Sequence, residues 1–195
     1  MIKEGIRLSY DHQFLTIKDF VDDLHIADYT EQTKADVVKR SVEFHSPIGP
    51  VDIKHFSIEN PFKLDISGIE FDNSSFTCGN GNPRSQCESV IFPTESNESS
   101  WVLFCELKYS LNPSKNKFHL TKAIKQLYKT RYYYYQNGIV NFTNTSYLVA
   151  SIPAQKVPFA NFTISPSNLS KLKRKRNIVL KLINKITINS EQLLG

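Results

Sequence analysis

The stretch of sequence that decides the fold is Cys87-Glu88-Ser89-Val90-Ile91-Phe92, followed after a polar turn by Trp101-Val102-Leu103-Phe104-Cys105-Glu106-Leu107-Lys108. The apolar run over residues 101–105 is typical of a strand that is buried on both faces. The run before it ends at Pro93, and the polar residues 94–100 predict a turn that joins two antiparallel strands. We therefore expect Glu88, at the start of the first strand, to lie beside Glu106 and Lys108 at the end of the second.

The acidic and basic residues at the end of this strand pair predict a catalytic site. Glu106 and Lys108 are two residues apart, so on a strand both side chains point to the same face. Two carboxylates such as Glu88 and Glu106 repel each other unless a cation neutralises them. Mg²⁺, for which Mn²⁺ is expected to substitute, binds one or two carboxylates together with water and phosphate. The alternative is that Glu106 and Lys108 form an ordinary ion pair at a strand end, with Glu88 solvated in a turn.

The pattern on either side of this strand pair predicts one α/β domain over residues 1–195. After the strands, apolar residues at helical spacing predict a helix over 120–134. The other expected elements are helices over 17–25 and 31–43, extended segments over 51–58 and 62–71 with a slip at Gly68, a loop over 73–86, and strands over 147–152 and 178–188. From residue 31 onward this order predicts a mixed central β-sheet with helices on both faces.

Composition excludes several classes of protein. The chain has 195 residues, of which 40% are hydrophobic and 22% charged, as in ordinary globular domains. No apolar window is long enough for a membrane-spanning helix, and the first residues lack the layout of a secretory signal, so we expect a cytoplasmic protein with no membrane partner. Cys78, Cys87 and Cys105 have no zinc-binding spacing, which favours reduced thiols.

The charge is distributed unevenly along the chain. Residues 113–195 contain 14 lysine and arginine residues and one acid, a net charge of +13, whereas residues 1–112 have a net charge of −8. Such a basic segment favours an anionic partner, nucleic acid or an acidic lipid surface, although the same charges could coat a solvated face. The candidate phosphate-binding residues are Lys122, Lys125, Lys129, Arg131, Lys173, Arg174, Lys175 and Arg176. The run of tyrosines at 132–135 could stack on bases or pack in the core.

The two quoted runs together resemble the core of the PD-(D/E)xK nuclease superfamily, which includes many restriction endonucleases. The resemblance covers about residues 30–155 and leaves residues 156–195 as a basic C-terminal extension. It implies a restriction-endonuclease-like αβββαβ core, metal-binding acids at Glu88 and Glu106, and a catalytic lysine at Lys108. In the family the first acid is usually Asp, and no proline precedes Glu88 in this chain.

Further positions come from the same resemblance. Asp72 is the rival first metal ligand, although it lies 34 residues before Glu106. An additional acid from the first helix would be Glu43, with Glu31 as the second choice. Gln126 lies near a position where some relatives have a supporting glutamine, but Thr130 stands where a tyrosine would follow.

These observations predict a Mg²⁺-dependent nuclease that hydrolyses phosphodiester bonds of DNA, in defence against foreign DNA or in repair; RNA remains an alternative substrate. A homodimer is one expectation, because cutting both strands of a duplex with so small an enzyme commonly needs two copies. The alternative function is a catalytically inactive nuclease-like module that binds nucleic acid or protein, or a subunit of a larger complex. Metal-dependent cleavage separates the first hypothesis from the second.

Overall fold

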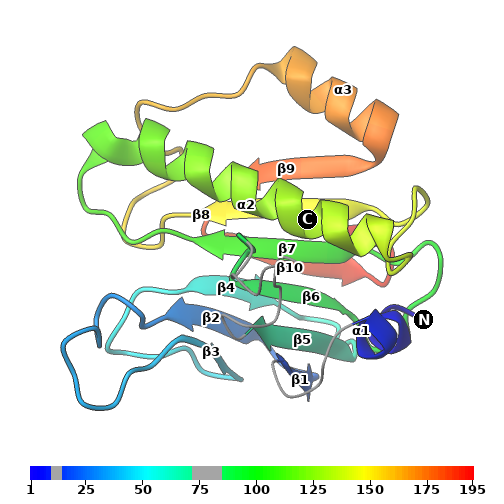
Figure 1. The fold of residues 1–195 in the computed structure, drawn as a ribbon, viewed down its shortest axis with the longest axis horizontal. Helices are drawn as coiled ribbons and strands as arrows, with labels where there is room; N and C mark the ends of the chain where they lie inside the picture. Colours follow the sequence, from blue (N-terminus) through cyan, green and yellow to red (C-terminus); the bar gives the residue numbers. More distant parts are fainter. Residues whose placement is uncertain (10–14, 72–84) are drawn as a thin grey trace, which may run out of the picture.

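The described residues form two mixed β-sheets and three α-helices (Figure 1). The structure is a computed structural model, and it describes residues 1–9, 15–71 and 85–195. The helices are α1 (Ile2–Ser9), α2 (Asn116–Gln136, preceded by a 3₁₀ turn at Pro113–Lys115) and α3 (Pro166–Arg176). The strands are β1 (Leu15–Phe20), β2 (Leu24–Asp28), β3 (Val42–His45), β4 (Phe56–Glu59), β5 (Ile66–Phe71), β6 (Ser89–Pro93), β7 (Val102–Leu107), β8 (Ser146–Ser151), β9 (Ile178–Leu182), β10 (Lys185–Ser190) and β11 (Leu193–Leu194).

The larger sheet has six strands in the order β1-β5-β6-β7-β8-β9. Strands β1, β5, β6 and β7 are antiparallel to their neighbours in this series, whereas β7, β8 and β9 run parallel. Parallel neighbours need a crossover connection, and α2 and α3 supply the two that are required here. The observed order of three strands, a helix and a strand (β5, β6, β7, α2, β8) is the order that the sequence predicts for this region.

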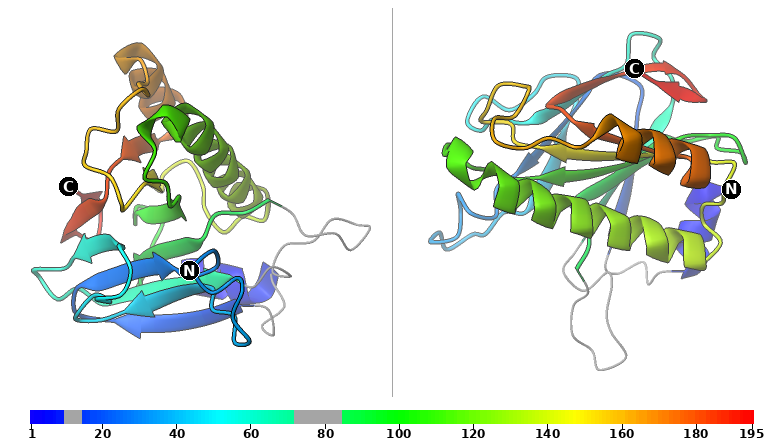
Figure 2. Two further views of the ribbon diagram at one scale, coloured as in Figure 1. Left: turned by 90° about the vertical axis from the view of Figure 1, so that its left-hand side faces the viewer. Right: turned by 90° about the horizontal axis from the view of Figure 1, so that it is seen from above.

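The second sheet has five strands in the order β11-β10-β4-β2-β3 and covers the face of the larger sheet opposite the helices. One apolar cluster lies between the helices and the larger sheet, and a second lies between the two sheets. Figure 2 shows α2 and α3 together on one side of the strands. The α/β class is therefore confirmed, but helices on both faces are not found among the described residues: a β-sheet takes their place on one face.

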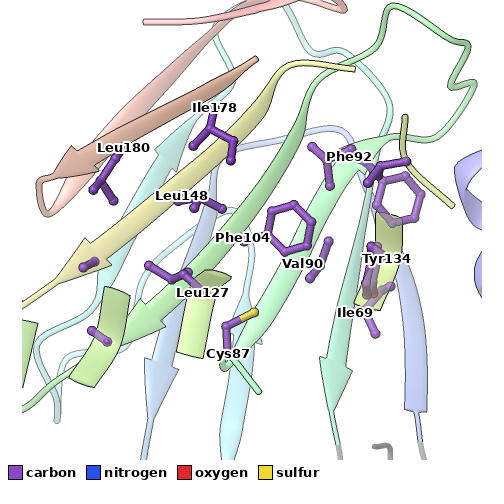
Figure 3. Packing of buried hydrophobic residues seen from close by; sticks show 14 of the residues in the cluster. Ile69, Cys87, Val90, Phe92, Phe104, Leu127, Tyr134, Leu148, Ile178 and Leu180 are labelled. Carbon is purple, nitrogen blue, oxygen red and sulfur yellow. The ribbon is translucent and has the colours of Figure 1, made fainter. Parts of the chain in front are cut away.

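Helix α2 forms because one stripe of its surface is apolar. Leu120, Ala123, Leu127 and Tyr134 recur at helical spacing and are fully buried against the larger sheet. Figure 3 shows Val90, Phe104 and Leu148 of the sheet facing this helix. The ring of Tyr134 meets that of Phe104 edge to face at 5.3 Å. The helix and the strand that follows it confirm the sequence prediction.

Helix α3 lies where the sequence shows a basic run, and its ends have clear capping signals. The side chain of Ser165 accepts a hydrogen bond from the backbone N–H of Asn168, and Pro166 occupies the first turn. Asn177 ends the helix in a left-handed conformation with φ of 50°. These capping signals are visible in the sequence, but the segment was interpreted only as a basic stretch. Its two apolar residues, Leu169 and Leu172, pack on the core.

The two helices predicted near the N-terminus are wrong. Residues 17–25 belong to β1 and β2, because β1 pairs with β5 about fifty residues later and no local pattern shows this. Residues 31–43 form turns and the start of β3. Val37 and Val38 are exposed there, so a helix in this segment would have little apolar surface to bury, and short helices need such burial.

The single strand predicted over residues 178–188 is two strands in different sheets. Strand β9 extends the larger sheet beside β8, and β10 pairs in parallel with β4 of the second sheet. Residues 156–195, predicted as a basic extension, thus contribute β9 to the larger sheet, β10 and β11 to the second sheet, and a helix over the larger one.

Gly68 is not a bulge but a point of close approach between the sheets. It pairs regularly with Lys18 and with Ile91. A Cβ atom at this position would lie 2.5 Å from a ring carbon of Phe44 on β3, so glycine makes room for that ring.

We expect Gly68→Ala to lower the free energy of unfolding by about 1–3 kcal/mol, because the added methyl group overpacks the contact with Phe44. Urea unfolding measures the loss. The double variant Gly68→Ala/Phe44→Leu removes the ring that clashes, and should lose less than the sum of the two single variants. Strict additivity would show that Phe44 is not the obstacle.

Candidate active site

The antiparallel pairing of β6 and β7 brings the three predicted catalytic residues to one end of the larger sheet. Ser89 lies opposite Cys105, and the backbone N–H of Glu88 donates to the carbonyl of Cys105 at 3.0 Å. Beyond the end of β7, the N–H of Lys108 donates to the carbonyl of Ser151 at 2.9 Å and continues the pairing with β8. Both neighbours of β7 therefore fix the backbone on which the acidic and basic side chains lie.

The side chains of these residues meet. Nζ of Lys108 donates a hydrogen bond to Oε1 of Glu106 and lies 3.9 Å from Oε1 of Glu88. The Glu106 side chain is fully buried, while those of Lys108 and Glu88 are 16% and 23% exposed. The site therefore opens to solvent on the side of Lys108 and Glu88, and Glu106 forms its floor.

Burial raises the pKa of both carboxyl groups at this site. Burial raises the pKa of Glu106 to about 7, although Lys108 acts in the opposite direction. Burial, and then the charge of Glu106, raise the pKa of Glu88 well above its ordinary value. Burial alone would lower the pKa of Lys108, but the two glutamates outweigh it and raise that pKa. The ammonium group is thus stably charged, whereas the carboxyl group of Glu106 gains or loses its proton near neutral pH.

This arrangement predicts a pH dependence of stability. As pH rises from 5 to 8 without metal, we expect the free energy of unfolding of the wild type to fall relative to that of Glu106→Gln. In the unfolded chain Glu106 ionises at its ordinary pKa, but the folded protein keeps the proton up to about pH 7. The folded state binds more protons in this window, so rising pH favours unfolding, by on the order of 3 kcal/mol. Urea titrations across this range measure the difference, and parallel curves would contradict it.

Asp28, at the end of β2, is a fourth charged group at this site. Its negative charge raises the pKa of Glu88, Glu106 and Lys108. Tyr109, which follows β7, joins it to that strand: the Tyr109 hydroxyl accepts from the N–H of Asp28 at 3.1 Å and donates to the carbonyl of Lys54 at 2.8 Å. The alternation Leu24-His25-Ile26-Ala27-Asp28 signals a strand that ends in an acid, but in the sequence Asp28 is equally consistent with a helix cap.

The alternative acids are placed differently. Asp72 lies outside the described residues. Both carboxylate oxygens of Glu43, on β3, accept hydrogen bonds from Arg40 at 2.7 Å, and this pairing lowers the pKa of Glu43. Glu31 is exposed beside Lys34. No first helix brings Glu43 or Glu31 to the site, because neither residue lies on a helix.

Helix α2 contacts the segment that leads into Glu88. Nε2 of Gln126 donates to the carbonyl of Gln86 at 2.9 Å, and the hydroxyl of Thr130 accepts from the N–H of Cys87 at 2.8 Å. The two positions noted in the sequence thus hold the backbone before Glu88. His119, one turn into the helix, has its pKa lowered by burial and then by the charge of Lys108, so this flank of α2 faces the site. A lone histidine gave no signal of this in the sequence.

The donor set of the site fits a hard divalent cation. Glu106 Oε2 is buried and has no hydrogen-bond donor, which leaves one carboxylate oxygen uncompensated at the floor of the site. In the described part of the chain, no three His, Cys, Asp or Glu side chains lie close enough together to hold an ion. Glu88 and Glu106 would supply two oxygen ligands, the number that Mg²⁺ commonly takes from protein when phosphate and water complete its coordination.

The predicted phosphate-binding residues divide into exposed and buried groups. Lys122, Lys125 and Lys129 on α2 lie outside the core, as do Lys173, Arg174, Lys175 and Arg176 on α3. Arg131 is only 6% exposed; its guanidinium donates to Oγ of Ser146 and to the carbonyl of Arg176 at 3.3–3.4 Å. Arg131 therefore joins the end of α3 to the sheet and does not face solvent.

Cys87 and Cys105 are buried free thiols, in agreement with the expected reduced state, whereas Cys78 lies outside the described residues.

Among the helices of the described segments, none combines the length and apolar character needed to cross a membrane. No family model, curated protein or solved structure matches this chain.

Proposed function

We propose that this protein is a Mg²⁺-dependent nuclease of the PD-(D/E)xK type that hydrolyses phosphodiester bonds of DNA. The observation that carries the proposal is the meeting of Glu88, Glu106 and Lys108 at one end of the larger sheet. A buried carboxylate oxygen without a donor adds support, because such a group needs a cation or a proton. The order β5-β6-β7-α2-β8 also supports the proposal, because it corresponds to the βββαβ part of the core that the resemblance implies, although the helix expected over residues 31–43 is missing.

Glu88 and Glu106 would hold the metal ion, and Glu106 must lose its proton to do so, because only the ionised carboxylate is an effective ligand. Mg²⁺ bound there would supply the positive charge that polarises the scissile phosphate. Deprotonation of Glu106 is easier near and above pH 7, given its raised pKa. Activity should therefore rise with pH through the neutral range.

Lys108 would act on the phosphate side of the site. Its ammonium group remains charged and is partly exposed, so it can donate a hydrogen bond to a phosphate oxygen. The ion pair with Glu106 would keep the ammonium group in place. A fixed positive charge of this kind stabilises the charge that develops in the transition state. The Tyr109 hydroxyl, just after β7, contacts the backbone of Asp28 in the second sheet and that of Lys54. These hydrogen bonds would hold this end of β7 in position.

The direct test is incubation of the purified chain with supercoiled plasmid and with linear DNA, in Mg²⁺, in Mn²⁺ and in EDTA. We expect nicked or shortened DNA in either metal and intact DNA in EDTA. The same assay with RNA tests the alternative substrate. Intact DNA and RNA in both metals, with a folded protein, would overturn the proposal.

The second candidate function is a catalytically inactive module that binds nucleic acid or protein through its basic surface. The observation that favours it is the exposed basic surface of the two helices, formed by Lys122, Lys125 and Lys129 of α2 and by residues 173–176 of α3. Such a module would give a salt-sensitive gel shift without cutting, because phosphate binding by lysine and arginine releases counterions.

A further inference from the structure

A groove lies between α2 and α3 on the helical side of the larger sheet. Its volume is about 620 Å³. Ile124 and Tyr128 of α2, Leu172 of α3 and Leu180 of β9 make its walls and floor apolar, and Lys171 and Lys175 of α3 line it as well. An apolar hollow lined with ammonium groups suits a ligand that is both flat and apolar in one part and anionic in another.

No described acidic residue compensates the positive charge around this groove. Helix α3 contains five basic residues and no acid. In the described part of the chain, no lysine or arginine of α2 or α3 forms a salt bridge. Exposed cations without carboxylate partners gain most from a polyanion, because its phosphates replace diffuse counterions.

The solvent-facing ridge of α2 connects the candidate active site to the groove. Phe118, Lys122, Lys125, Lys129 and Tyr132 are spaced by four or three residues, so they form one stripe along the helix. Phe118 is 68% exposed and Tyr132 53%. These aromatic rings stand at the two ends of a row of lysines.

The two flanks of α2 serve different surfaces. At about 100° per residue, Gln126 and His119 project to one flank and Ile124 and Tyr128 to the opposite flank, with the stripe between them. The first flank contacts the segment before Glu88 and lies near Lys108. The second flank lines the groove. A chain that leaves the active site over α2 therefore reaches the groove after crossing the lysine stripe.

We propose that this surface binds single-stranded DNA, with phosphates on the lysine stripe of α2 and unstacked bases in the groove between α2 and α3. Duplex DNA would offer the lysines its phosphates but keeps its bases stacked inside, so it would leave the apolar groove empty. Single strands expose bases that stack on aromatic side chains such as Tyr128. The apolar floor also suits deoxyribose, which lacks the 2′-hydroxyl. It follows that the substrate of the nuclease contains a single-stranded segment, and this part of the inference rests on the proposed nuclease function.

The test is binding measured by fluorescence anisotropy in EDTA, where no cleavage occurs. The probes are labelled oligothymidine, oligouridine and a blunt duplex, each longer than the roughly 4–16 nucleotides that such surfaces usually cover. We expect oligothymidine to bind at least about tenfold more tightly than the duplex and more tightly than oligouridine. Equal or tighter binding of the duplex, or tighter binding of oligouridine, would overturn the proposal.

Two variants locate the site. Tyr128→Leu keeps apolar bulk but removes the stacking ring, and should weaken oligothymidine binding about tenfold with little effect on the duplex. Lys122→Gln/Lys125→Gln removes two lysines of the stripe and should reduce the slope of log affinity against log salt by about 1.4, since each phosphate contact on a single strand contributes about 0.7. The matched control is Lys63→Gln/Lys185→Gln, which removes two exposed lysines outside α2 and α3 and should leave the slope unchanged.

The outcomes also separate this inference from the proposed function. If oligothymidine binds as expected but is never cut in Mg²⁺, the nuclease proposal fails and the binding surface stands. If DNA is cut but Tyr128→Leu and the lysine variant bind as the wild type does, the binding surface fails and the nuclease proposal stands. Direct binding of labelled poly-glutamate or of phosphatidylglycerol vesicles, without any binding of oligothymidine, would identify an acidic protein or lipid partner and overturn the inference.

Discussion

Glu106→Gln and Lys108→Ala are each expected to lower Mg²⁺-dependent DNA cleavage by about 100- to 1,000-fold. The amide introduced by Glu106→Gln would keep the shape of the side chain but could not supply a negative oxygen to the metal ion. The lysine variant removes the ammonium group that would face the phosphate, and leaves Glu106 to take up a proton in its buried position. The measurement is the initial rate of plasmid nicking at saturating Mg²⁺.

The control for these variants is a second ion pair with the same chemistry. Lys185 and Glu59 pair at 2.8 Å on the second sheet, where both side chains are exposed. Glu59→Gln and Lys185→Ala change the same charges and should cut DNA at the wild-type rate. Circular dichroism and thermal unfolding establish that each variant is folded. Wild-type cleavage by a folded Glu106→Gln or Lys108→Ala would refute the catalytic assignment.

Trp101→Ala is expected to lower the free energy of unfolding by about 3–5 kcal/mol, a large share of the roughly 5–15 kcal/mol typical of a whole domain. Trp101 precedes β7 and is fully buried between the two sheets. Its indole N–H donates to the carbonyl of Ser190 at 2.9 Å and so connects β7 to the end of β10. Truncation would open a cavity and leave that carbonyl without its partner. Urea unfolding followed by circular dichroism gives the size of the loss.

Trp101→Phe separates the two contributions of this side chain. Phenylalanine fills most of the space but donates no hydrogen bond, so its loss should be closer to that of a single buried hydrogen bond, about 1–3 kcal/mol. An alanine variant as stable as the phenylalanine variant would show that packing of the ring contributes little. That result would also contradict the assignment of Trp101 to the core between the sheets.

The elements that the sequence predicted correctly have strong local signals. The apolar run of β7 and the 3.6-residue pattern of α2 are visible in short windows, because each element packs along most of its own length. The N-terminal strands have no such signal. The partner of β1 is β5, and the hydrogen bonds between them join residues about fifty positions apart, so the local spacing of apolar residues over 17–25 predicted a helix where the structure has strands.

The candidate site likewise contains residues whose meeting the sequence could predict and residues whose place only the tertiary structure shows. Glu88, Glu106 and Lys108 lie on two strands joined by a short turn, and a register of antiparallel pairing is enough to predict that they meet. Asp28 lies on a strand of the other sheet, and only the packing of the two sheets brings its charge to the site. For the same reason Arg131, basic and next to exposed lysines in the sequence, is buried in the structure by the end of α3.

The sequence by itself determined the α/β class, the central strand pair and the identity of three converging side chains, because hydrophobic periodicity and strand pairing act over a few residues. The tertiary structure decided which layer covers the second face of the larger sheet, which acid from outside the motif lies near Glu88 and Glu106, and which basic residues face solvent. These depend on contacts between segments far apart in the chain. Their free energy comes from burying surfaces against each other, and no local window of sequence contains both surfaces.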